Sequence, residues 1–93
     1  RPEIYLAGMD EPSRELAFKL CGGLRAHGIN AECDLMGRSV KAQFKYADKI
    51  GARYAAAIGA NEAESGVVNI KEMSTGESSA VKINEIYEYL IKR

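Results

Sequence analysis

Three strand-like segments, separated by two helical patterns, constrain the fold of this chain more than any other feature. Residues 3–9 (EIYLAGM) and 53–59 (RYAAAIG) have nearly continuous apolar centres, which are typical of strands buried on both faces of a sheet. Residues 29–35 (INAECDL) instead alternate apolar and polar side chains, as a half-exposed edge strand does. Connections between parallel strands are right-handed in nearly all proteins. We therefore expect these strands in the order 2-1-3, with the two helices on opposite faces.

Residue types that start and stop helices mark the ends of both helical patterns. The first helix is expected to begin where Asp10 or Ser13 can cap it, and to end at Gly28. The second is expected to follow Ser39 as its N-cap and to end at Gly51. Apolar side chains recur at helical spacing in both segments: Leu16, Ala17, Leu20, Cys21 and Leu24 in the first, and Val40, Phe44, Ala47 and Ile50 in the second.

The rest of the chain predicts a strand hairpin and a last helix. Residues 60–65 are expected to form a turn, and residues 66–73 and 78–83 to form strands around a tight turn that contains Gly76. Asn84 is expected to cap a helix whose inward side chains are Ile86, Tyr87, Leu90 and Ile91. The predicted fold class is α/β, with three layers and a five-stranded mixed sheet of order 2-1-3-4-5 in which strand 4 is antiparallel.

Composition places the chain among globular domains and excludes a membrane protein. Its 93 residues, 46% of them apolar, suffice for one domain over residues 1–93. Thirteen basic and thirteen acidic residues cancel, so any electrostatic signal must come from local placement. No run approaches the ~20 apolar residues of a membrane span, and no membrane partner is expected. The chain starts with Arg-Pro rather than methionine, so we expect a fragment of a longer protein.

Catalytic, metal and redox roles are not expected. Cys21, Cys33 and the single histidine, His27, fall short of the roughly four ligands of a zinc site. Free thiols in a reducing cytoplasm are the expected state of the cysteines. The chain also lacks a Gly-x-Gly-x-x-Gly signature and a P-loop, and its histidine is predicted at the wrong edge of the sheet to activate a nucleophile at the ligand edge. A binding module is therefore favoured over a self-contained enzyme.

The carboxyl ends of strands 1 and 3 predict where a ligand binds. Ligands of open α/β sheets bind outside the strand ends at the point where the strand order reverses. Those ends are residues 8–10 and 59–62. The second helix is expected to start at the same edge, near Lys41, and the N–H groups at a helix start attract phosphate.

The second helix carries a run of basic residues, for which a ligand-binding surface and an exposed, solvated face are the two explanations. Five basic residues against one acid, Asp48, occupy this stretch: Arg38, Lys41, Lys45, Lys49 and Arg53. Most helical charge runs are solvated faces, and spacing alone favours that explanation. Gln43 differs from them, because it lies about 60° from Val40 around the helix, inside the apolar arc. An amide there should be buried with a partner or placed at the rim of a site.

Four short motifs together resemble a known family. They are Lys-x-Gln-Phe-Lys-x-Ala-Asp from Lys41, Gly-Ala-Arg-Tyr from Gly51, Ile-Gly-x-x-Glu from Ile58 and Val-x-Ile-Lys from Val68. The combination resembles the C-terminal anticodon-binding domain of class II aminoacyl-tRNA synthetases over essentially the whole chain, and it is most similar to the histidyl branch. Threonyl, prolyl and glycyl relatives share the Gly-x-x-Glu strand end. Residues 55–57 (AAA) are smaller than the aliphatic residues usual in that strand, which leaves the core packing open.

The resemblance implies a site for an anticodon loop. It implies that Glu62 reads a base edge and that Gln43, Lys45 and Lys71 lie near the loop. Unstacked loop bases are read by paired donors and acceptors; a glutamate accepts, whereas a glutamine does both. The alternatives are a turn carboxylate for Glu62 and a solubilising charge for Lys71. The predicted anticodon site comprises Gly8, Met9, Arg38, Lys41, Gln43, Lys45, Gly59, Asn61, Glu62 and Lys71, without a catalytic residue or metal ligand.

The resemblance also implies partners outside this chain. They are the anticodon stem-loop of tRNA(His) and a class II catalytic domain of the same protein, which would ligate histidine to tRNA(His) using ATP and Mg²⁺. The chain itself is expected to hold no cofactor, and the parent protein is expected to be a homodimer. A regulatory or accessory protein derived from a synthetase, such as the histidine-biosynthesis regulatory subunit or a stress-kinase domain, is one alternative. The anticodon domain of a threonyl, prolyl or glycyl relative is another.

Overall fold

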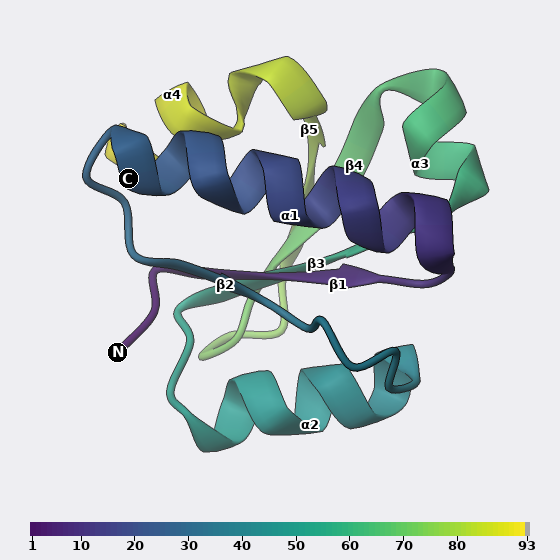
Figure 1. Ribbon diagram of the computed structural model, residues 1–93. Helices are drawn as coiled ribbons and strands as arrows, with labels where there is room; N and C mark the ends of the chain where they lie inside the picture. Colours follow the sequence, from purple (N-terminus) through teal and green to yellow (C-terminus); the bar gives the residue numbers. More distant parts are fainter. Residues whose placement is uncertain (93) are drawn as a thin grey trace.

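Five strands form one mixed sheet between helices on both faces in the computed structural model, which describes residues 1–92 (Figure 1). The strand order is β2-β1-β3-β4-β5, with β1 parallel to β2 and β3, and β4 antiparallel to β3 and β5. The predicted fold class and strand order are therefore confirmed. In chain order the elements are β1 (Ile4–Gly8), α1 (Glu11–Ala26), β2 (Ala31–Cys33), α2 (Val40–Lys49), β3 (Tyr54–Ile58), α3 (Ala60–Ser65), β4 (Val67–Glu72), β5 (Ser78–Lys82), the 3-10 turn η1 (Ile83–Glu85) and α4 (Ile86–Ile91).

The larger part of the core lies on the face of the sheet that α1 and α4 cover (Figure 1). Alternate strand residues point to this face, and they meet apolar side chains of both helices. Burying one aliphatic side chain of this size contributes about 1.5–3 kcal/mol to stability. The fully or nearly fully buried members include Ile4, Leu6, Ala17, Cys21, Ala56, Ile58, Val68, Ile70, Ile86 and Leu90.

A smaller core under α2 is built mainly from alanines. Ala47 on the helix and Ala55 on β3 are fully buried, and the larger Tyr5 on β1 completes this layer. Small side chains on both surfaces let a helix approach a sheet closely, which gives Ala55 a packing role that a larger aliphatic residue could not fill. Ala56 points to the opposite face, where larger side chains surround it.

The helix α2 lies over β1 and β3, so the same face of β4 and β5 is left open. Asn69, Ala80 and Lys82 on this open face are exposed, and Lys71 beside α2 is half-buried. The structure thus presents an uncovered strip of sheet next to the helix that carries the lysines.

Residues 60–65 form the helix α3 rather than the predicted turn. A six-residue helix is too short to show a periodic apolar pattern, and none of its residues is buried. Its start is fixed by the Glu62 carboxylate, which accepts a hydrogen bond from the N–H of Gly59 at 2.8 Å. Its end is Gly66, whose φ of 74° suits glycine.

The strand predicted for residues 29–35 is shorter than expected, and its alternation is broken. Only Ala31–Cys33 pairs with β1. Asp34, expected on the polar side, is buried at 3% exposure, whereas Leu35, expected on the apolar side, is 67% exposed. The cause is local, because the Asp34 carboxylate accepts backbone hydrogen bonds from the residues that follow it and so turns the chain out of the sheet.

The chain enters the last helix differently from the prediction. Asn84 lies inside the turn η1 and does not cap α4 through its side chain. Ile91, predicted to face inward, is 55% exposed because α4 is only six residues long and ends there. The other predicted caps are confirmed: Asp10 accepts from Ser13 N–H at the start of α1, and Ser39 accepts from the third residue beyond it at the start of α2.

At Gly8, β1 passes close to the backbone of α1, and replacing this glycine should destabilise the fold. A Cβ on Gly8 would lie 2.6 Å from the backbone N and Cα of Arg14, which cannot move without shifting the helix. We expect Gly8→Ala to lower the free energy of unfolding by about 1–3 kcal/mol in urea titrations. Gly22→Ala is the matched control, since a Cβ on Gly22 in mid-helix meets nothing within 4 Å. It should stabilise by about 0.5–1 kcal/mol. Similar effects of both substitutions would contradict the close approach.

Candidate nucleic-acid interface

Three helices begin at one edge of the sheet, on the right in Figure 1. β1 and β3 end side by side there, with Gly8 paired to Ile58 and the N–H of Met9 donating to the Ile58 carbonyl at 2.8 Å. From these ends, and from the loop after β2, the chain enters α1, α3 and α2. The carboxyl edge of the parallel strands therefore brings together all the predicted site residues except Lys71.

Lys41 and Lys45 are exposed on the first two turns of α2. Neither takes part in an ion pair within residues 1–92. The other end of the basic run lies elsewhere, because Lys49 is in the last turn of α2 and Arg53 pairs with Glu3 at 3.1 Å. The basic residues are thus divided between the two edges of the sheet. Lys41 and Lys45 lie toward the predicted site, whereas Lys49 and Arg53 lie toward the opposite edge.

Arg38 is already held by an acid of the protein. Its guanidinium bonds to Oδ1 of Asp34, with Nε at 3.1 Å and the second nitrogen at 3.0 Å. Burial acts to raise the pKa of Asp34, but the hydrogen bonds from Arg38 and from the N–H of Met36 outweigh it and lower this pKa. The hydrogen bond to Asp34 also raises the pKa of Arg38. The sequence analysis did not predict a role for Asp34. Its spacing of four residues from Arg38 was the feature that could have indicated this ion pair.

The side chain of Gln43 is fully buried. Its Nε2 donates to the carbonyl of Arg38 at 2.7 Å and to the carbonyl of Gly8 at 3.2 Å. Its Oε1 has no hydrogen-bond partner among residues 1–92. The amide therefore joins the start of α2 to the end of β1 from beneath the surface.

Glu62 and Gly59 lie together at the start of α3. One carboxylate oxygen, Oε1, accepts from the N–H of Gly59, while no protein donor within residues 1–92 bonds to the other oxygen. The glutamate is half-buried, and Asn61 beside it is exposed. A Cβ on Gly59 would collide with the sulfur of Met9, which is 55% exposed. A base that approached Gly59 would first have to displace this flexible side chain.

Lys71 lies within the strand β4, on the face of the sheet beside α2, and not at the carboxyl ends of the strands. It lies on the α2 side of β4, opposite Ala55, and its Nζ is 6.0 Å from the centre of the Phe44 ring. The exposed Asn69 and Lys82 continue the same face toward β5. A chain bound along this strip could contact the lysine and the start of α2 together.

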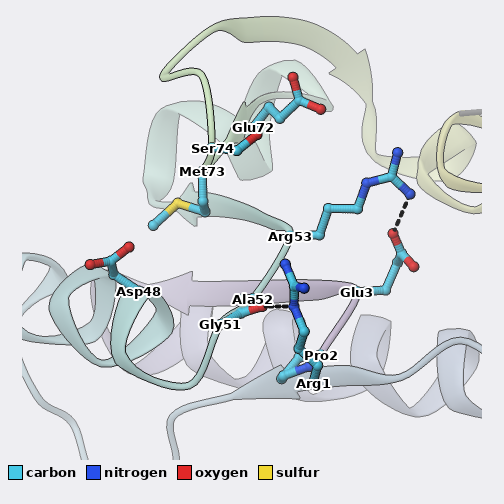
Figure 2. A pocket seen from close by; sticks show the side chains of 10 residues that line it. All are labelled: Arg1, Pro2, Glu3, Asp48, Gly51, Ala52, Arg53, Glu72, Met73 and Ser74. Atoms are coloured by element: carbon cyan, nitrogen blue, oxygen red, sulfur yellow. Dashed lines mark hydrogen bonds and ion pairs between the residues drawn. The ribbon is translucent and has the colours of Figure 1, made fainter.

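A hollow of about 680 Å³ lies at the opposite edge of the sheet, near the amino ends of β1 and β3 (Figure 2). Its charged groups are largely satisfied within the protein. Arg53 pairs with Glu3, and Arg1 Nε donates to the carbonyl of Gly51 at 2.8 Å. Because its lining carries both signs of charge, with Asp48 and Glu72 as further acids, it is a poor match for a polyanion.

Three other features of the described chain bear on function. Within residues 1–92, no group of three or more histidine, cysteine or acidic side chains lies close enough to hold a metal ion. Cys21 and Cys33 are free thiols, and burial raises the pKa of both. Over the same residues, no helix has the length and apolar character needed to cross a bilayer.

Comparisons with known proteins agree with this geometry. The profile of the family described as "Anticodon binding domain" matches residues 3–93. Histidine--tRNA ligase of Pelotomaculum thermopropionicum is 47% identical over 89 residues, which cover 96% of this chain and 21% of that protein. The enzyme of Pyrococcus furiosus is 35% identical over 89 residues, with the same coverage of 96% and 21%. The chain thus spans about a fifth of the length of these curated relatives.

The solved structures that resemble this chain are also of aminoacyl-tRNA synthetases. The crystal structure of apo S. aureus histidyl-tRNA synthetase superposes with a TM-score of 0.93 at 33% identity, covering 97% of this chain and 23% of that one. The RNA binding domain of threonyl-tRNA synthetase from Cryptosporidium parvum gives 0.86 at 15% identity, covering 98% and 23%, which shows a common fold. The chain belongs to the family of anticodon-binding domains of aminoacyl-tRNA synthetases.

Proposed function

We propose that this chain is the anticodon-binding domain of a histidine--tRNA ligase and that it binds the anticodon loop of tRNA(His). The observation that carries the proposal is the match to histidine--tRNA ligases over 96% of the chain at up to 47% identity among the relatives described above. The parent protein would join this domain to a class II catalytic domain that uses ATP and Mg²⁺. It would act as a homodimer in the cytoplasm. This chain would contribute binding and no catalytic group.

The arrangement at the carboxyl edge supports binding of an RNA loop. Lys41 and Lys45 carry charges that no acid of residues 1–92 compensates, and RNA phosphates would supply the missing partners. The second carboxylate oxygen of Glu62 is an acceptor for amino or imino groups of an unstacked base. Lys71 and the open strip of β4 and β5 would extend the surface along the loop.

Lys41 and Lys45 should act on all RNAs alike. Replacing either with alanine should weaken binding to cognate and non-cognate anticodon stem-loops by the same factor. It should also reduce the slope of log K against log salt by roughly 0.7–1, because one phosphate contact and its released counterion are lost. Fluorescence anisotropy titrations at several salt concentrations measure both quantities.

Lys19→Ala is the matched control for these lysine substitutions. Lys19 is an exposed lysine of α1, the helix that covers the opposite face of the sheet. Its removal changes the net charge equally but should leave the salt slope unchanged. A loss of discrimination between the two RNAs at an unchanged slope would contradict phosphate binding by Lys41 and Lys45.

Glu62→Gln should weaken binding of the cognate anticodon selectively. The amide carbonyl of a glutamine can replace Oε1 as the acceptor for the N–H of Gly59, which keeps the start of α3. Its NH₂ group would then occupy the place of the second carboxylate oxygen and present a donor where the base needs an acceptor. We expect a loss of about 1–3 kcal/mol for the cognate stem-loop and little loss for one with a substituted anticodon.

Binding at one fixed salt concentration measures this selectivity. Glu64→Gln is the matched control, since Glu64 is exposed in the same short helix and makes no hydrogen bond or ion pair within residues 1–92. It should affect both RNAs equally. If Glu62→Gln also reduced both affinities equally, or neither, Glu62 would only cap α3.

A further inference from the structure

We propose that Asp34 is a positioning residue of the RNA-binding edge, which holds the half-exposed Arg38 against the protein as a structural cation and thereby fixes the start of α2. The inference rests on the proposed function. It assigns the basic residues of the edge to two different tasks. Arg38 would hold the helix in place, while Lys41 and Lys45 on that helix would contact phosphate.

The Asp34 carboxylate is enclosed by the residues that follow it. Its Oδ2 accepts from the N–H of Arg38 at 2.8 Å, and its Oδ1 accepts from the N–H of Met36 at 3.2 Å and from the Arg38 side chain. At 3% exposure, a carboxylate without such partners would be strongly unfavourable. The acid therefore fixes both the backbone and the side chain of Arg38.

The guanidinium of Arg38 also packs against α2. It lies over the ring of Tyr46, 4.9 Å from the ring centre, on the second turn of the helix. Tyr46 in turn meets Tyr5 of β1 edge-on, with 6.1 Å between ring centres. Burial, followed by the negative charge of Asp34, raises the pKa of Tyr5 to about 12, so the ring next to this pair stays neutral. Arg38 is thus held between a carboxylate and an aromatic stack.

Hydrogen bonds from the Gln43 side chain to two backbone carbonyls continue this network to the end of β1. The carbonyl of Arg38 accepts from Nε2 of Gln43, and the same nitrogen donates to the carbonyl of Gly8 at the end of β1. Only Ser39, the N-cap, separates Arg38 from α2. The path Asp34–Arg38–Gln43–Gly8 therefore joins the end of β2, the loop, the helix and the end of β1.

This network has an electrostatic consequence for RNA binding. A buried carboxylate at an edge that binds phosphates would repel them unless a cation offset its charge. Arg38 supplies that cation, so the pair is close to neutral. Lys41 and Lys45 remain the basic groups of this helix start that no acid within residues 1–92 neutralises.

The substitution Asp34→Asn distinguishes two roles for Asp34. The acid either positions the start of α2 or competes with RNA phosphate for Arg38. If Asp34 positions the helix, the variant should bind the anticodon stem-loop roughly three- to tenfold more weakly, with the wild-type salt slope. If Arg38 is instead a phosphate ligand that Asp34 holds back, the variant should bind more tightly and with a steeper slope. Tighter binding, or unchanged binding, overturns the proposal.

Two further variants serve as controls for the loss of one negative charge and for the Asp34–Arg38 contact. Asp48→Asn removes the same charge from the exposed far end of α2 and should not weaken binding. Arg38→Lys keeps the positive charge but loses the two-pronged contact with Asp34 and the stacking on Tyr46. It should weaken binding about as much as Asp34→Asn, and full binding by Arg38→Lys overturns the proposal even if Asp34→Asn fails to fold.

Amide hydrogen exchange tests the positioning role without RNA. In Asp34→Asn, exchange should accelerate at the amides of Arg38, Ala42 and Gln43, relative to those of β4 in the same molecule. Unchanged exchange at these amides overturns the proposal. If the wild-type chain did not bind the stem-loop at all, the proposed function would fail, and the exchange result would still decide whether Asp34 fixes the start of α2.

Discussion

The parallel pairing of β1 with both β2 and β3 is the constraint on which the rest of the structure depends. It places the ends of three strands at one edge, and from that edge the chain enters α1, α2 and α3. The close packing that this requires uses small residues: Gly8 passes against the backbone of Arg14, and alanines separate α2 from the sheet. Polar groups meet at this edge because the topology brings them there, although they come from distant parts of the sequence.

Charge at the two ends of the sheet is organised in different ways. At the edge with the hollow, basic and acidic side chains are mixed, and Arg53 pairs with Glu3. At the other edge, the buried Asp34 is compensated by Arg38, while Lys41 and Lys45 are exposed without an acidic partner among residues 1–92. A net charge of zero is therefore compatible with a local surface that attracts RNA.

The sequence could predict the strand order and the edge of the site, because continuous apolar strands and helix caps are local signals of a global topology. It could also place Gln43 in the apolar arc of its helix, which agrees with its burial. It could not predict the break at Asp34, since three local hydrogen bonds and the ion pair with Arg38 outweigh the alternating pattern there. Nor could it reveal that Glu62 caps its own helix, because six residues carry no periodic signal.

Mapping of the RNA contact on the isotope-labelled 93-residue chain by NMR tests the central claim most directly. Amide chemical shifts would be followed while the anticodon stem-loop of tRNA(His) is added. If the carboxyl edge binds RNA, the largest changes should cluster at residues 38–45 and 59–64 and extend to Lys71. Changes centred on residues 48–53 and 72–74, which surround the hollow at the opposite edge, would contradict the account.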